Sequence, residues 1–583
     1  MQHRRHGCRV VRVQLLSTSL LLLALAACSS PAPARAPTGA GAAPAPAQQA
    51  APTRLSIGIG AEINNLATKL EGGNTFASEF NFMSNSPLVL LDSQGAPRPL
   101  LAAELPSRDN GTWTVNPDGT MTTLWKIRPN AKWHDGRPVV ANDFLFSHRV
   151  TMDDAVPVRD REPERYMERL EAQDDKTVLI HWKQPYPWAN QLVQHELEPL
   201  PEHIMGSLHA SGDTEAFLNN PFWSSTAYVG TGPFTLVQWD PGTQLVYRAF
   251  NDYFMGRPKI DEVTFRVISD SNAVVANVLG GNVDVTLGVT LGQRAGVTVK
   301  SQWDLSGDGQ VLVVPVRFRY TQIQLDANRT QQPALLDPRV RRAIAHGIDR
   351  STLAEIVTEG TSTSTEIPLV PNDPIYPAAD RAAAKYPYDQ NRALALLQEA
   401  GWTRRGEALV NDSAQQFVLD IRTTAGSDNE TEMSIMSADL SKLGMQISQT
   451  VAAQSRIRDN EYRVTFPGLN TTAQSIANPG ILAVVTSDQC ASNEKRFVGS
   501  NRGCWKNAEF DRLYATATQS LDPTERGQAV VSALKVLTEE VGILGLSYNS
   551  ENLAIRKGLV GLGPRWSAQT GNTWNIHEWH WAQ

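Results

Sequence analysis

The chain has 583 residues, of which 41% are hydrophobic and 19% are charged, and its formal net charge is −7. This length exceeds what one hydrophobic core usually serves, so we expect two or more lobes. The acidic balance argues against nucleic acid as a partner.

The first 53 residues have the composition of an export signal followed by a linker. Four arginines precede an apolar run over 15–27, which predicts a secretory signal peptide over 1–27 that is too short for a permanent anchor. The run ends in Leu25-Ala26-Ala27-Cys28, which resembles the bacterial lipobox, where Cys28 takes the lipid. Ordinary cleavage before an unmodified cysteine is the alternative. Residues 28–53 are mostly Ala, Pro, Gly and Gln, which predicts a disordered linker.

Short strands and helices alternate through the first half of the remaining chain. Turn residues bound each segment, and apolar spacing sets its type. The predicted elements are strands over 55–59 and 125–128, a helix capped by Asn142 or Asp143, a hairpin of strands 235–239 and 244–247, a strand over 260–268 and a helix over 272–279.

The second half has clearer helix signals. Asp337 followed by Pro338 is a helix cap with proline at the first helical position, and Asp349 predicts the cap of a second helix ending at Gly360. A strand over 417–421, a helix with apolar residues from 433 to 443 and a strand from 445 follow. This βαβ pattern predicts parallel pairing with a right-handed crossover.

Two cysteines remain beyond the lipobox. Cys490 and Cys504 lie 14 residues apart with glycines and asparagines between them. In an oxidising compartment this spacing predicts a disulfide that closes a surface loop. Two free thiols are the alternative.

Several short motifs imitate chemical sites but lack a required residue. The His-Asp-Gly at 134–136 indicates a turn. Residues 304–309 copy the first half of a calcium loop, but Pro315 stands where that loop needs a bidentate Glu, so we expect a hairpin turn. The histidines at 577 and 580 are three apart rather than the four of a zinc-protease helix. We therefore expect no catalytic residue, no metal site and no cofactor, and no enzyme.

Eight segments in register resemble the family 5 extracellular solute-binding proteins of bacterial ABC importers, the group of the oligopeptide-, dipeptide- and nickel-binding proteins. The likeness covers about residues 54–583. The segments are PDGT (117–120), WKIRPNAKWHDG (125–136), ANDF (141–144), GTGPF (230–234), NDYF with GRPKID (251–261), DPRVRRA with IDR (337–350), YPYD with AGW (386–402) and WKNAEFDRL (505–513).

The resemblance implies an α/β, two-lobed periplasmic-binding-protein type II fold with a hinge between the lobes. We expect lobe I over 54–90, 230–316 and 546–583, an extra subdomain of lobe I over 91–229, and lobe II over 317–545.

The resemblance also implies a substrate-binding lipoprotein that captures a peptide-like or other small solute between closing lobes and delivers it to a membrane permease. The expected partners are that solute, the permease subunits of an ABC importer and the membrane through the lipid anchor, with the protein itself a monomer. We expect it in the cell envelope, at the outer face of the cytoplasmic membrane or in the periplasm. An extracytoplasmic receptor or chaperone-like binder without transport is the alternative, and a secreted hydrolase or metalloenzyme lacks the required residues.

In peptide-binding relatives a loop with a Gly-Trp-x-x-Asp-like run pairs its aspartate with the peptide α-ammonium. Here Leu469 stands in place of the Trp and Thr472 in place of the Asp, with Asn470 and Thr471 between them. We expect the loop over 468–474 to line the cleft, opposite Asn81 and Asn85.

A neutral hydroxyl does not replace a buried carboxylate that pairs with a charge. The expected site is therefore polar and uncharged and binds free peptides weakly. Another acid, Glu62 or Asp428, is the alternative partner for an ammonium group.

Overall fold

The computed structural model describes residues 52–66, 69–70, 76–158, 161–456, 459–476, 479–567 and 570–582. The expected signal peptide, Cys28 and most of the expected linker lie outside the described residues.

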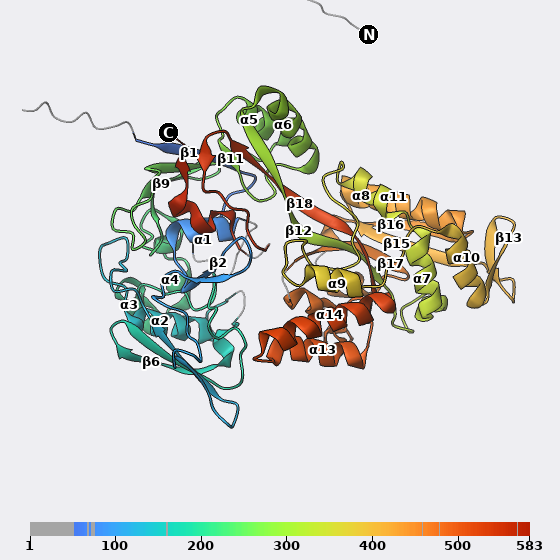
Figure 1. Ribbon diagram of the computed structural model, residues 1–583, viewed down its shortest axis with the longest axis horizontal. Coiled ribbons are helices and arrows are strands. Elements are labelled where there is room, and N and C mark those ends of the chain that lie inside the picture. The colour runs from blue at the N-terminus through green and yellow to red at the C-terminus, as the bar shows by residue number, and fades with distance from the viewer. Residues whose placement is uncertain are drawn as a thin grey trace, which may run out of the picture. The chain divides into compact units, whose positions relative to one another are not determined.

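A mixed sheet of ten strands runs through the described chain from one lobe to the other (Figure 1). Its strands, in spatial order, are β16 (Gln446–Ala452), β15 (Val418–Thr424), β17 (Leu469–Ser475), β12 (Gly309–Ile323), β18 (Ile543–Arg556), β11 (Val285–Thr286), β1 (Arg54–Ile59), β10 (Glu262–Val267), β9 (Gln244–Ala249) and β8 (Phe234–Asp240).

The two long central strands, β12 and β18, connect the lobes. They pair antiparallel from Gly309 opposite Arg556 to Gln322 opposite Ile543, with a register shift between Pro315 and Arg317. Proline donates no backbone hydrogen bond to a ladder, which is why it is found at such irregularities. The expected lobe boundary at 316–317 falls at this shift, and the division into lobes and subdomain stays a prediction.

The first lobe is built on β1, which alternates apolar residues as its sequence indicates. Leu55, Ile57 and Ile59 are buried, and β1 lies parallel to β10 and β11. A second, antiparallel sheet lies in this lobe and has its own apolar cluster around Trp125, Trp133 and Trp182. Its strands, in order, are β4 (Trp113–Val115), β5 (Met121–Lys126), β7 (Thr177–Trp182) and β6 (Met167–Asp174).

The second lobe contains the predicted βαβ unit. Strand β15, helix α11 (Ser427–Lys442) and strand β16 follow one another, and the strands pair in parallel from Val418 opposite Gln446 to Thr424 opposite Ala452. Both predicted caps are present: the Asp337 carboxylate accepts from the Arg339 N–H at 2.8 Å and the Asp349 carboxylate from the Thr352 N–H at 3.1 Å.

The other helices and short strands surround these sheets. The helices are α1 (Ala77–Ser84), α2 (Ala141–Met152), α3 (Glu202–Ala210), α4 (Thr214–Leu218), α5 (Ser271–Leu279), α6 (Gln293–Ser306), α7 (Pro338–Gly347), α8 (Arg350–Val357), α9 (Tyr376–Ala382), α10 (Gln390–Glu399), α12 (Asn460–Val464), α13 (Ala508–Gln519) and α14 (Pro523–Glu539). The strand pairs are β2 (Val89–Leu91) with β3 (Pro97–Pro99), β13 (Trp402–Arg405) with β14 (Ala408–Asn411) and β19 (Leu559–Val560) with β20 (His580–Trp581).

Three local predictions were wrong. The N-cap of α2 is Val140, and Asp143 instead accepts from its N–H at 2.9 Å. We expected a hairpin turn over 304–309. These residues instead form the end of helix α6, with Gly307 as its left-handed C-cap, and the start of β12. The expected loop over 468–474 is strand β17, because it pairs with β12 on one side and with β15 on the other.

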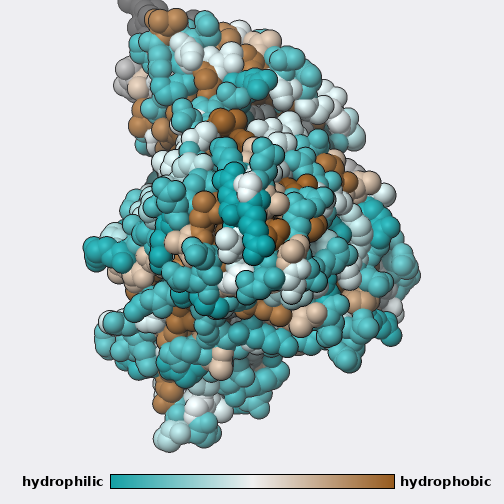
Figure 2. Space-filling view, turned by 90° about the vertical axis from the view of Figure 1, so that its right-hand side faces the viewer, coloured by the Kyte–Doolittle hydropathy of each residue, from teal (hydrophilic) through white to brown (hydrophobic). Residues whose placement is uncertain are grey.

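The outer face of the second lobe is largely hydrophilic. Figure 2 shows hydrophobic residues interspersed among hydrophilic ones across this view. Among the described residues, none of the helices combines the length and the apolar composition that spanning a bilayer requires.

Candidate functional site

Strand β17 places the predicted site residues in two different environments. Leu469 is fully buried in the core of the second lobe, whereas Asn470, Thr471 and Thr472 line a cavity of about 440 Å³. Gly468 precedes the strand because a Cβ there would lie 2.5 Å from the Asp420 carbonyl oxygen. The packing of β17 on β15 thus fixes which of these side chains a solute can reach.

The cavity lies at the carboxyl ends of three parallel strands. β15 ends at Thr424, β16 at Ala452 and β17 at Ser475, and Thr424, Ala452 and Gln474 are among the lining residues. Open α/β sheets bind ligands at this edge because backbone amides and loop side chains converge there. The second lobe therefore has a hollow where the fold favours a binding site.

A buried ion pair lies beside this cavity, and its arginine lines an adjacent cavity. The Arg319 Nε lies 2.6 Å from a Glu432 oxygen, and these side chains are 3% and 0% exposed. A second Arg319 nitrogen donates to Asn429 at 2.8 Å, and Thr471 donates its hydroxyl to Thr423 at 2.8 Å. Burial raises the pKa of Glu432, and the Arg319 charge opposes that rise. These bonds connect the ion pair to Asn429 and Thr471, which line the cavity.

Arginines line the cavity walls, which the sequence reasoning missed. Arg317 lies on β12 and Arg422 on β15, while Arg456, Arg463 and Arg502 come from three later segments. They are distant in the sequence, so no local spacing announces them. The predicted site was expected to be uncharged, whereas the cavity that contains Asn470, Thr471 and Thr472 also has guanidinium groups on its walls.

The two asparagines predicted to face β17 lie elsewhere in this structure. Asn81 is fully buried on α1, where its Nδ2 donates to Glu198 at 2.8 Å and its Oδ1 accepts from Gln194 at 3.0 Å. Asn85 accepts from the Tyr228 hydroxyl at 2.9 Å and lines a small cavity within the first lobe. Neither lines the arginine cavity, and their role in binding stays a prediction.

The alternative acids also have defined positions. Glu62 accepts from the Trp239 Nε1 and from the Gly242 N–H, both at 2.7 Å, so its carboxylate is engaged within the first lobe. Asp428 lines a cavity adjacent to the arginine cavity, which it shares with Thr472. Asp428 is therefore the better placed of the two to meet a solute beside Thr472.

A second and larger cavity lies between the lobes. Its volume is about 810 Å³, and its lining combines aromatic and acidic residues of the first lobe with residues of the second. Tyr166, Tyr186 and Trp188 line it from one side, and Asp488 and Tyr514 from the other. Burial raises the pKa of the Tyr186 hydroxyl well above its ordinary value. Both lobes thus contribute to a hollow large enough for a small solute.

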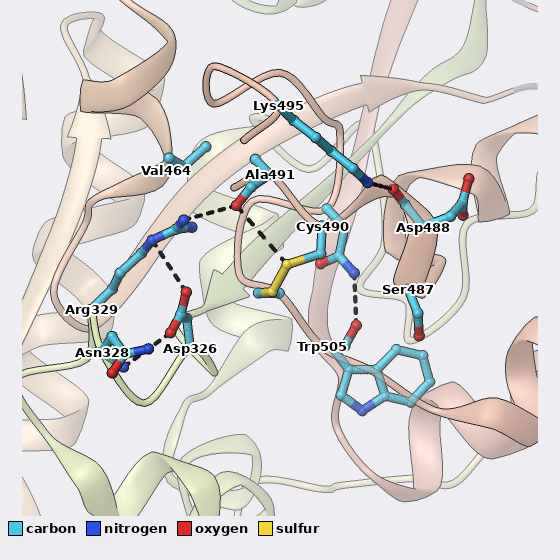
Figure 3. The surroundings of a disulfide bond; sticks show 12 residues. Asp326, Asn328, Arg329, Val464, Ser487, Asp488, Cys490, Ala491, Lys495 and Trp505 are labelled. Atoms are coloured by element: carbon cyan, nitrogen blue, oxygen red, sulfur yellow. Dashed lines mark hydrogen bonds and ion pairs between the residues drawn. A yellow bond between two sulfur atoms is a disulfide. The ribbon is translucent and has the colours of Figure 1, made fainter. Parts of the chain in front are cut away.

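The bonded cysteines lie next to this region (Figure 3). Cys490 and Cys504 are joined with their Cα atoms 4.8 Å apart. Arg329 holds the segment by donating to the Ala491 carbonyl at 2.8 Å, and Asp326 lies 3.2 Å from the same guanidinium. The loop that the cysteines close contains Arg502, so the disulfide fixes the segment that brings this arginine to the cavity.

In the described ranges, no group of three or more His, Cys, Asp or Glu side chains is placed to hold a metal ion. His134, from the His-Asp-Gly turn, instead contacts the Gly232 carbonyl at 3.0 Å, and burial lowers its pKa to about 4. The neutral imidazole is thus a structural contact between two loops.

Known proteins resemble this chain in sequence and in fold. Residues 96–482 match the family described as "Bacterial extracellular solute-binding proteins, family 5 Middle". The oligopeptide-binding protein AppA of Bacillus subtilis is 23% identical over 450 residues, which cover 76% of this chain and 78% of AppA.

Two solved structures share the fold. The oligopeptide-binding protein of Thermus thermophilus, complexed with a pentapeptide, superposes with a TM-score of 0.68 at 24% identity and covers 91% of this chain and 96% of its own. NikA from Brucella suis, in complex with Fe(III)-EDTA, superposes with a TM-score of 0.69 at 20% identity and covers 91% of this chain and 99% of its own.

Proposed function

The chain belongs to the bacterial extracellular solute-binding proteins of family 5, and from this membership we propose that it is the substrate-binding lipoprotein of an ABC-type importer. In this role it captures a peptide-like or other small solute between its two lobes and delivers it to a membrane permease. The family match over residues 96–482 carries the proposal, and the cavity between the lobes supports it.

Capture by two lobes requires that the solute contact both of them. A solute shifts the equilibrium between open and closed lobes toward the closed state. The size of this shift equals the difference between its binding free energies for the two states. The second lobe offers the arginine cavity, and the cavity between the lobes adds aromatic walls from the first. A permease that recognises the closed state then receives loaded protein preferentially.

The class of solute depends on Thr472. AppA and the Thermus protein are named for oligopeptides, whereas the NikA structure holds Fe(III)-EDTA. A free peptide brings an α-ammonium that needs a carboxylate partner, and Thr472 supplies only a hydroxyl within the arginine cavity. We therefore expect weak binding of free peptides.

The experiment on peptides compares the parent protein with Thr472→Asp and with the neutral control Thr472→Asn. Each is titrated calorimetrically with a mixed library of di- to pentapeptides. We expect weak binding by the parent and by Thr472→Asn, and restored binding by Thr472→Asp. Tight binding by the parent would show that another acid, such as Asp428, takes the ammonium.

Transport is tested separately from solute class. Mass spectrometry of solute that co-purifies with the protein identifies the cargo, and uptake of that labelled cargo is measured in cells with and without the gene. We expect deletion of the gene to abolish uptake and the reintroduced chain to restore it. Uptake that is unaffected by deletion would contradict a role in import and favour a receptor.

A further inference from the structure

Positive charge dominates the cavity at the carboxyl ends of β15, β16 and β17, here called the arginine cavity. Five guanidinium groups line it, and among the described residues that line it there is no Asp or Glu. They come from five separate segments and converge only in the folded lobe. The arginines that line the cavity are Arg317, Arg422, Arg456, Arg463 and Arg502.

Most of these charges are held without being neutralised. Arg422 donates through Nη1 to the Tyr462 carbonyl at 2.8 Å, and Arg317 donates through Nη2 to the Ala473 carbonyl at 3.0 Å. Within the described ranges, Arg456 alone among the five lies within 4.0 Å of a carboxylate, that of Asp459 at 3.1 Å. Backbone carbonyls orient a guanidinium but leave its full charge in place.

Tyr462 fixes the geometry of two of the arginines. The Arg422 guanidinium carbon lies 4.3 Å from the centre of the Tyr462 ring, and that of Arg456 lies 4.4 Å from it. Cation–π contacts of this kind stabilise a guanidinium over an aromatic ring. The Nε of Arg422 is buried and has no hydrogen-bond partner in the described structure, so a donor remains unsatisfied at this place.

An anion is the ligand that satisfies this arrangement. Like charges in a cavity repel one another, and a guanidinium presents a rigid fork of donors that matches a carboxylate or phosphate. Asn470 and Thr472 line the same cavity with uncharged polar groups. A volume of about 440 Å³ accommodates a small polyanion.

We propose that the arginine cavity binds the anionic oxygen-bearing groups of the solute, carboxylate or phosphate, and that the preferred solute carries at least two of them. This assignment rests on the proposed function, since it names the solute class of the same binding protein. It gives Arg422 the central role, because Tyr462 fixes the orientation of its guanidinium group.

The test is calorimetric titration of the mature, extensively dialysed protein with two anionic probes. Tricarballylate carries three carboxylates and propane-1,3-diol bisphosphate two phosphates, and trimethyl tricarballylate and propane-1,3-diol are their neutral controls. We expect an anionic probe to bind with an affinity that falls as salt rises, and the neutral controls not to bind. The two probes distinguish a carboxylate solute from a phosphate solute.

Three variants then locate the binding. Arg422→Met should weaken binding about 10- to 100-fold, because it removes charge-assisted hydrogen bonds, and Arg422→Lys should restore part of the loss. Arg456→Met is a second variant on an exposed side chain, which does not endanger folding. The matched control is Arg512→Met on α13, where the exposed arginine pairs with Glu509 at 2.7 Å, and its affinity should equal that of the parent.

Failure of both anionic probes to bind, or an undiminished affinity in both Arg422→Met and Arg456→Met, would overturn the assignment. A neutral co-purified solute whose uptake depends on the gene would overturn it too while leaving the role in import intact. Anion binding by a protein whose deletion leaves uptake unchanged would leave the assignment intact and contradict import.

Discussion

The buried carboxyl group of Glu79 makes the stability of this protein depend on pH. Glu79 lies on α1 and is 1% exposed, and its oxygens accept from the Asn572 Nδ2 and the Thr573 N–H, both at 3.1 Å. Burial raises its pKa from 4.5 to about 7; the Arg565 charge opposes this rise and the Glu551 charge adds to it. The group is therefore partly protonated in the folded protein near neutral pH.

The sign and size of the effect follow from the raised pKa. Because the folded protein binds this proton more tightly than the unfolded chain, the contribution to stability is fully present below pH 4.5 and is lost as the pH rises through 7. The shift corresponds to about 3 kcal/mol, most of which is lost between pH 5 and pH 8.

The assay is urea denaturation of the parent and of Glu79→Gln at pH 5 and pH 8. At each pH, the free energy of unfolding of Glu79→Gln is subtracted from that of the parent. This difference removes the contribution of groups that titrate alike in both proteins. We expect the stability of the parent relative to Glu79→Gln to fall by about 2 to 3 kcal/mol over this range. Glu355→Gln on the exposed surface of α8 is the control and should show no such change. A difference between parent and Glu79→Gln that is the same at both pH values would refute the reasoning.

Three further outcomes are expected. Cys28→Ser should move the protein from the membrane to the soluble fraction without unfolding it, and unchanged retention would contradict lipidation. Replacing Cys490 and Cys504 together by Ser should cost about 3 kcal/mol of stability for a loop of this length, and in exported parent protein both thiols should resist alkylation until reduction. Arg319→Met should destabilise by about 3 to 5 kcal/mol, because Glu432 is left buried without its partner; an equal loss in the double variant Arg319→Met/Glu432→Leu would contradict that explanation.

Local sequence determined the elements and much of their pairing. Two helices begin at Asp337 and Asp349 because the short carboxylate of each accepts a hydrogen bond from a free backbone N–H of the first turn. Pro338 helps because its fixed φ already suits a helix. Neither effect depends on the rest of the chain. The apolar pattern of the βαβ unit likewise implies its parallel strands. These features depend on residues close together in the chain, so a single sequence reveals them.

Tertiary structure alone decided the character of the binding cavity. The polar segment over 468–474 is identifiable in the sequence, but its conversion to a central strand depends on partners in β12 and β15. Arg317 and Arg502 are separated by most of the second lobe in sequence, yet line one cavity. The sequence shows that an arginine is charged. Its spatial neighbours decide whether that charge is paired or remains available to a solute, and they are set only when the strands assemble.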